Sequence, residues 1–177
     1  MEEFEKRRLT SGSAFGKIPI ELVKMEPAMF VSQKCQYAVR ATFELAKRYG
    51  QGPVRIADIA EAQAIPVRFL EVILNQLKQG GFVLSHRGSR GGYMLARPPA
   101  ELAVGDVIRF IEGPLGPVVC AMGNSQADCR LYGGCVFLPM WERVRSAVSG
   151  VYDQTTFQSL VDSDARRTEE YVASYAI

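Results

Sequence analysis

The side chains best suited to chemistry in this chain are three cysteines that lie close together. Eight residues separate Cys120 from Cys129, and five separate Cys129 from Cys135. Thiolates are soft ligands that suit zinc or iron–sulfur clusters. Structural zinc sites usually have paired ligands about two to four residues apart, and this segment has no such pair. The spacing therefore favours a cluster held by three cysteines and one outside ligand, and it leaves thiol oxidation without a metal as an alternative.

The segment that carries these cysteines is rich in glycine and proline and is too polar and too broken for regular structure. Such a composition is typical of a segment that a metal organises, and it argues against three unrelated buried thiols. The fourth cysteine, Cys35, lies far away in the sequence. In a protein of the cytosol, four cysteines so distributed favour ligands or thiol chemistry over structural disulfides.

Length and composition indicate a globular protein of one domain with appendages. The chain has 177 residues, of which 47% are hydrophobic and 23% are charged, so it can bury a core without disulfides. No apolar stretch approaches the roughly 18 residues of a membrane span, and the N-terminal residues do not form a signal peptide pattern. We therefore expect a cytoplasmic protein with no membrane partner.

The elements that precede the cysteines have the pattern of a helix-turn-helix. Apolar residues at helical spacing predict helices over 32–49, 54–62 and 67–79, with a turn at 64–66 that ends on Pro66. The last of these helices is expected to place five apolar residues toward the core: Phe69, Leu70, Ile73, Leu74 and Leu77. Its outer face then carries Arg68, Glu71, Asn75, Gln76 and Lys78. The length matches a helix-turn-helix.

A short hairpin follows directly, with expected strands over 82–84 and 93–96 and a glycine-rich, arginine-bearing tip between them. Glycine permits close backbone approach to a phosphate, and arginine offers a planar set of donors for phosphate or for a narrow minor groove. The segment 66–97 has five basic residues against one acidic residue, although the net charge of the chain is only +2. The pattern predicts a DNA-binding wing, while a basic surface without DNA is the alternative.

The expected fold class is mainly α with a small β-hairpin wing, a winged helix-turn-helix followed by a long dimerisation helix. A helix over 104–111 packs back on the core, and 168–176 is weakly helical. The dimer contact is expected on one seam of the long helix, formed by Met140, Trp141, Val144, Ala147, Val148 and Val151, although core packing explains the same periodicity. The expected organisation is an N-terminal extension over 1–28, the DNA-binding domain over 29–112, the cysteine loop over 113–136, the dimerisation helix over 137–157 and a tail over 158–177.

Taken together, these residues resemble the IscR/NsrR family of bacterial winged-helix regulators over about 29–157. The segments that carry the resemblance are YAVRA at 37–41, IADIA at 56–60, FLEVIL at 69–74 and RGSRGGY at 87–93. The resemblance implies a homodimer whose recognition helices enter successive major grooves of a palindromic operator in double-stranded DNA. It also implies an iron–sulfur cluster, [2Fe–2S] or [4Fe–4S], on Cys120, Cys129 and Cys135.

The chain departs from that family pattern at two places. The gap between the first two loop cysteines is longer than usual, and the histidine that serves some members as fourth ligand is replaced by Leu138. Other members use an acidic residue at the start of the first helix, contributed by the partner subunit. The matching position here is Gln36, with Cys35 beside it, so both are candidate fourth ligands.

The sequence thus predicts a dimeric, non-enzymatic regulator of transcription, such as a repressor, that senses iron–sulfur, redox or nitric oxide status. The residues expected to contact DNA are Arg68, Glu71, Asn75, Lys78, His86, Arg87, Ser89 and Arg90. One alternative is a regulator of the same fold that lacks a cluster and responds to thiol oxidation or to a protein partner. A remote alternative is an iron–sulfur redox enzyme, against which the chain shows no nucleotide-binding loop and no second histidine.

Overall fold

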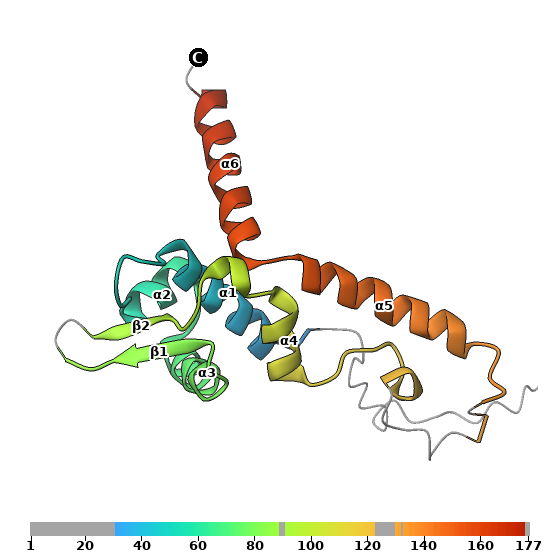
Figure 1. Cartoon of the computed structure of the whole chain (residues 1–177). Helices are drawn as coiled ribbons and strands as arrows, with labels where there is room; N and C mark the ends of the chain where they lie inside the picture. Colours follow the sequence, from blue (N-terminus) through green and yellow to red (C-terminus); the bar gives the residue numbers. More distant parts are fainter. Residues whose placement is uncertain (1–30, 89–90, 123–129, 132, 176–177) are drawn as a thin grey trace, which may run out of the picture.

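The computed structural model in Figure 1 describes residues 31–88, 91–122, 130–131 and 133–175. This part of the chain is mostly helical and has one two-stranded antiparallel sheet, which confirms the expected fold class. The elements are α1 (Gln33–Lys47), α2 (Ile56–Gln63), α3 (Val67–Gln79), β1 (Val83–His86), β2 (Gly92–Leu95), η2 (Pro99–Glu101), α4 (Val104–Glu112), η3 (Val119–Met122), α5 (Leu138–Gln154) and α6 (Phe157–Tyr175).

Helix α1 forms the centre of the core, packed against α2, α3, α4 and α6. Its N-terminus is capped by Ser32, whose hydroxyl accepts a hydrogen bond from the backbone N–H of Cys35 at 3.2 Å. The buried face of α1 contains Cys35, Ala38 and Ala41, each fully buried. These small side chains let neighbouring helices approach closely, so α1 fixes the positions of all four of them.

The turn between α2 and α3 places the second helix of the pair. Ala64 adopts a left-handed conformation with φ of 47°, which reverses the chain direction at the end of α2. The next residue, Ile65, is 3% exposed and donates its backbone N–H to the carbonyl of Ala60 at 2.9 Å. Helix α3 then begins after Pro66, whose carbonyl accepts from the N–H of Leu70.

The hairpin pairs Val83 with Leu95 and His86 with Gly92. A third chain segment joins its edge, because Val54 and Tyr93 exchange two backbone hydrogen bonds of 2.8 Å. Glycine is required at position 92, since a Cβ atom there would overlap the carbonyl group of Val54. The base of the hairpin is therefore tied to the segment that leads into α2, and strands β1 and β2 extend away from the body (Figure 1).

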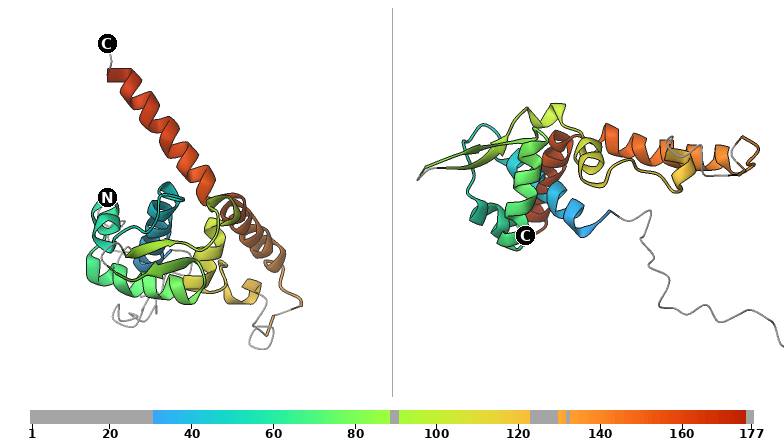
Figure 2. Two further views of the ribbon diagram at one scale, coloured as in Figure 1. Left: turned by 60° about the vertical axis from the view of Figure 1, so that its left-hand side comes forward. Right: turned by 90° about the horizontal axis from the view of Figure 1, so that it is seen from below.

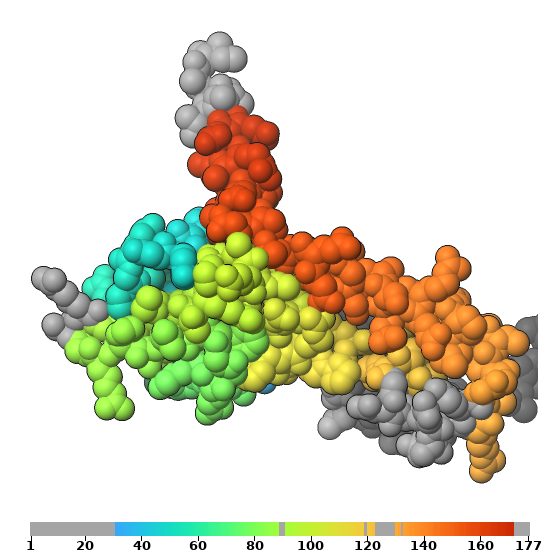
Figure 3. Space-filling model, in the orientation of Figure 1, coloured from blue at the N-terminus to red at the C-terminus, as the bar shows by residue number. Residues whose placement is uncertain are grey.

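Helices α5 and α6 leave the body from one junction and diverge as separate arms (Figures 1–3). The junction pairs with the start of α4, because Val104 donates its N–H to the Thr155 carbonyl at 2.8 Å and Phe157 donates to Leu102 at 3.0 Å. The Phe157 side chain is fully buried. An ion pair between Arg109 and Asp153 ties α4 to the last turn of α5. The root of both arms is thus anchored in the core.

The structure differs from the sequence-based expectation in the last part of the chain. A weak helix was expected over 168–176, whereas α6 begins at Phe157. Its first turns are helical because Phe157, Leu160 and Val161 pack against the core. No helix in the described part of the chain is long and apolar enough to cross a membrane.

Candidate functional site

The exposed face of α3 presents four of the five polar residues that the sequence assigned to it, whereas the fifth, Gln76, is half-buried and its Oε1 is buried. Leu70, Ile73, Leu74 and Leu77 are at most 1% exposed and fasten the helix to the core. The four polar residues of α3 that were expected to contact DNA are all exposed, namely Arg68, Glu71, Asn75 and Lys78. The structure therefore brings these four side chains together on one solvent-facing helix.

Phe69 does not lie where the sequence pattern placed it. It was expected on the core face, and the prediction is wrong because its side chain is 65% exposed. At about 100° per residue, Phe69 lies roughly 90° from the centre of the buried stripe of α3. The core is already filled by the four aliphatic residues of that stripe, so an aromatic ring on its flank remains in solvent.

Three cations of this region have no charged partner within the described part of the chain. Arg68 and Lys78 on α3 and Arg87 after β1 form no ion pair there. Elsewhere, some basic residues are paired, as with Arg55 and Asp58 at 2.8 Å, whereas others, such as Arg143 and Arg145 on α5, also form no ion pair within the described residues. Unpaired guanidinium and ammonium groups grouped on α3 and the hairpin make this surface suited to a polyanion.

The structure describes part of the hairpin tip, residues 86–88 and 91–92. His86 and Arg87 are exposed, and Gly88 has a φ of 108°, which favours glycine. Ser89 and Arg90, which the sequence assigned to the DNA contact, lie outside the described residues. Gly91 is needed for the tip, since a Cβ atom there would overlap the carbonyl oxygen of His86. The described tip thus presents Arg87 on a closely folded backbone.

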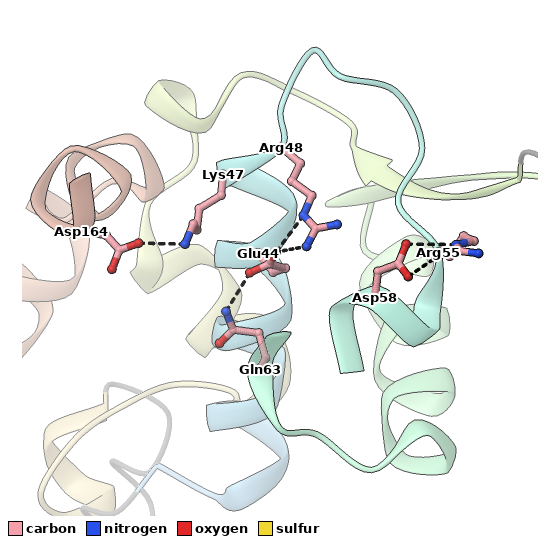
Figure 4. Close-up of polar contacts among 7 residues, drawn as sticks. All are labelled: Glu44, Lys47, Arg48, Arg55, Asp58, Gln63 and Asp164. Atoms are coloured by element: carbon pink, nitrogen blue, oxygen red, sulfur yellow. Dashed lines mark hydrogen bonds and ion pairs between the residues drawn. The ribbon is translucent and has the colours of Figure 1, made fainter. Parts of the chain in front are cut away.

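A buried glutamate holds the helix pair in place (Figure 4). Glu44 of α1 has a side chain that is 4% exposed, and it accepts from Nη2 of Arg48 at 2.7 Å. Its second oxygen accepts from Nε2 of Gln63, the last residue of α2, at 2.9 Å. Sequence reasoning missed this residue, and the available signal was its place between Ala41 and Leu45 on the buried face of α1. Glu44 thereby fixes the end of α2 to α1.

The described parts of the cysteine loop include η3 and the residues just before α5. Cys120 in η3 and Cys135 just before α5 are free thiols and both are half-buried. Cys129 lies outside the described residues. Within the described residues no three His, Cys, Asp or Glu side chains form a group that could hold a metal ion. Two free, partly accessible thiols with a third between them in sequence fit the donor set that an iron–sulfur cluster prefers.

The two candidate fourth ligands have different surroundings at the start of α1. The Cys35 side chain is fully buried, and burial, followed by the charge and hydrogen bond of Glu112, raises the pKa of its thiol to about 12. Glu112 ends α4 and accepts from the N–H and hydroxyl of Ser32 at 3.0 and 2.5 Å. Gln36 is exposed, and its Nε2 donates to the Val31 carbonyl at 2.9 Å. Sequence reasoning did not identify Glu112 as a neighbour of Cys35.

Helix α5 has no buried residue in the single chain. Met140, Val148 and Val151 are 44%, 36% and 64% exposed, and Ala147 is also exposed. Trp141 and Val144 are half-buried, and α5 packs against α4 and η3. An apolar seam thus runs along the solvent side of the helix.

Comparisons with known proteins agree with this architecture. The Rrf2 family model, described as iron-dependent transcriptional regulator, matches residues 31–163. The chain is 34% identical over 144 residues to the HTH-type transcriptional regulator CymR of Bacillus subtilis, covering 81% of this chain and 98% of that protein. It is 32% identical over 135 residues to the HTH-type transcriptional regulator IscR of Serratia proteamaculans, covering 76% and 80% of the two.

The solved structures give the same result for the fold. The structure of CymR, described as the global cysteine regulator of B. subtilis, superposes with a TM-score of 0.65 at 33% identity. The match covers 76% of this chain and 98% of that one. Over about three quarters of its length, this chain therefore shares its fold with a solved regulator.

Proposed function

The chain belongs to the Rrf2 family of DNA-binding transcriptional regulators, and we propose that it acts as a homodimer whose operator affinity follows the state of the cysteine loop. The relatives are regulators, so the alternative of a redox enzyme is not retained. As a regulator of transcription it would work in the cytoplasm, where bacterial DNA lies. The observation that carries the proposal is the group of unpaired cations on α3 and the hairpin.

In the proposed complex α3 enters the major groove and the hairpin tip reaches the minor groove or the phosphates. Arg68, Glu71 and Asn75 point outward from a helix that is fixed to the core along its opposite face, and such helices place side chains on base edges. A dimer with two-fold symmetry would bind a palindromic operator with half-sites about one helical turn apart or slightly more.

The proposed contact between the hairpin tip and DNA can be tested by measuring how DNA affinity depends on salt concentration. We expect the double variant Arg87→Ala and Arg90→Ala to bind all DNA sequences roughly tenfold or more weakly. The slope of log affinity against log salt should fall by about 2, because two phosphate contacts release fewer counterions. Fluorescence anisotropy with an operator selected from random DNA measures both quantities.

The matched control is the double variant Arg166→Ala and Arg167→Ala, which removes the same charge from exposed positions on α6. It should leave the slope within about 0.5 of the unmodified protein, since α6 points away from α3 and the hairpin (Figure 2). Equal slopes for the wing variant and the unmodified protein would exclude a wing contact with DNA.

For the sensor we propose that Cys120, Cys129 and Cys135 hold an iron–sulfur cluster. The support is the donor set: the two described thiols are free and half-buried, and thiolates are the ligands such clusters take from proteins. When bound, the cluster would supply a redox-active and chemically labile group. The protein's part is to present the thiolates at the end of α5 and to couple their position to that helix.

The cluster prediction has a direct chemical test. Each of Cys120→Ala, Cys129→Ala and Cys135→Ala should yield protein without bound iron and without visible absorbance, because a cluster that lacks one thiolate is labile in water. Iron and sulfide analysis after anaerobic reconstitution measures the loss. Iron content and absorbance unchanged in all three variants would show that these cysteines do not hold a cluster.

The same preparation distinguishes the candidates for fourth ligand. Loss of iron in Cys35→Ala but not in Gln36→Ala would assign the position to Cys35, and the reverse result would assign it to Gln36. Retention of iron in both variants would point to a solvent molecule or a small molecule as the fourth ligand. The burial of Cys35 and its contact with Glu112 favour a structural role in α1 for that thiol.

A second candidate function shares the fold but uses the thiols directly. The free and partly accessible thiols of Cys120 and Cys135 favour it, because a thiol that solvent can reach is open to oxidation. Peroxide treatment followed by mass spectrometry of the iron-free protein would show a disulfide or sulfenic acid in this loop, together with a change in operator affinity.

A further inference from the structure

Helix α3 carries apolar side chains that do not pack in the core. Val72 is 58% exposed and Phe69 is 65% exposed, although Leu70, Ile73, Leu74 and Leu77 already fill the buried face. A single exposed apolar residue is common on protein surfaces. Two neighbouring ones, on a helix whose other exposed residues are almost all polar or charged, indicate a contact surface.

Helical geometry places Val72 in the middle of the outward face. Residues three and four apart are neighbours on a helix surface, so Val72 lies next to Arg68 on one side and Asn75 on the other. Phe69 lies three residues before Val72 and widens the apolar area toward the flank of the helix. All four residues are exposed. The outward face therefore has an apolar part, Val72 and Phe69, beside a polar and basic part.

The surroundings indicate what covers this patch. Helix α3 lies on the side of the body away from α6 (Figures 1 and 2), and Arg68 and Lys78 have no ion-pair partner in the described part of the chain. An apolar protein surface would leave these cations desolvated and unpaired. The major groove combines anionic phosphate walls with a floor on which the thymine 5-methyl group is the apolar feature.

We propose that Val72, with Phe69 beside it, contacts thymine 5-methyl groups in the major groove and so selects thymine at defined operator positions. The inference rests on the proposed DNA binding by α3 and adds a source of specificity to it. Each buried methyl group should change affinity by roughly fourfold, the factor that corresponds to burial of one methylene group. This discrimination needs no hydrogen bond, so it acts beside the contacts of Arg68 and Asn75.

The test removes single methyl groups from the DNA. An operator is selected from random duplexes with the unmodified dimer, and each thymine is then replaced in turn by uracil, which lacks only the methyl group. We expect roughly fourfold weaker binding at one or two positions in each half-site. Val72→Ala should weaken binding to the thymine operator and should no longer distinguish thymine from uracil at one of these positions. Phe69→Ala is measured in the same way.

The matched control is Asn75→Ala, which changes the neighbouring exposed residue of the same face. It should weaken binding yet keep the difference between thymine and uracil. Because Val72 and Phe69 are exposed, their alanine variants should keep the circular dichroism spectrum and dimer of the unmodified protein. A dimer that selects an operator but is indifferent to every uracil substitution would overturn the methyl contact while leaving DNA binding intact.

Two further results distinguish a failure of the proposed methyl contact from a failure of the proposed DNA binding. A uracil effect that persists unchanged in both Val72→Ala and Phe69→Ala would assign the methyl contact to another residue and overturn the inference. A protein that selects no operator at all would contradict the proposed function itself. A third result would point to a protein as the occupant of α3. In that case the chain selects no operator, and another protein surface binds α3 tightly but does not bind Val72→Ala.

Discussion

Replacing Val151 by glutamate is expected to convert the proposed dimer into a monomer. Val151 is 64% exposed in the single chain, so a glutamate there can be solvated and should leave the fold of the chain intact. In the proposed dimer the same side chain lies in the apolar seam with Met140 and Ala147, where an unpaired carboxylate is costly. The dissociation constant of the dimer should rise roughly 100-fold or more, equivalent to about 3 kcal/mol.

Sedimentation velocity over a range of protein concentrations measures this change. Val144→Glu should also weaken the dimer. Because Val144 is half-buried in the single chain, this variant should lower the stability of the fold as well. The control is Ser146→Glu, an exposed position on the opposite side of α5, which should leave the association unchanged. An intact dimer for Val151→Glu would place the subunit interface elsewhere.

Glu44→Ala is expected to lower the free energy of unfolding by about 3 kcal/mol. The substitution removes the buried acceptor of Arg48 and Gln63, so the amide of Gln63 loses its partner at the α1–α2 contact. Half-exposed Arg48 can regain water, which limits the loss. Urea unfolding at fixed dimer concentration, followed by circular dichroism, measures the change.

Two variants sharpen this experiment. Glu44→Gln keeps an acceptor for Gln63 and should lower the free energy of unfolding by only about 1 kcal/mol. Glu61→Ala removes an exposed carboxylate from α2 and should change it by less than about 0.5 kcal/mol. An unfolding midpoint for Glu44→Ala equal to that of Glu61→Ala would mean that the buried hydrogen bonds contribute nothing to the position of α2.

The DNA-binding part of the fold was predictable because its signals are local. Aliphatic residues at helical spacing indicated α3, and the glycines around Arg87 indicated a tight hairpin tip, which the backbone overlaps at Gly91 and Gly92 explain. The spacing misplaced Phe69, since periodicity shows which residues share a side but not where the core ends. The same limit explains α6, whose helical start depends on the burial of Phe157 in the core.

The partners in contacts that join distant segments could not be predicted from local sequence patterns. The place of Glu44 between Ala41 and Leu45 indicated burial, but only the fold reveals that Gln63 approaches it. Glu112 likewise meets Ser32 and Cys35 from the other end of the domain. The ligand set around the loop cysteines stays a prediction, because Cys129 lies outside the described residues.

The anchored junction at Thr155 makes α5 a lever with its fulcrum in the core. The helix has 17 residues, so it extends about 25 Å from that junction to the cysteine loop. A tilt of about 10° at the fulcrum corresponds to a displacement of about 4 Å at the loop, close to the rise of one base pair, about 3.4 Å. If α5 is fixed against its counterpart in the proposed dimer, the same tilt would turn the core by about 10° relative to α5, and α3, which is fixed to the core, would change its orientation by the same angle.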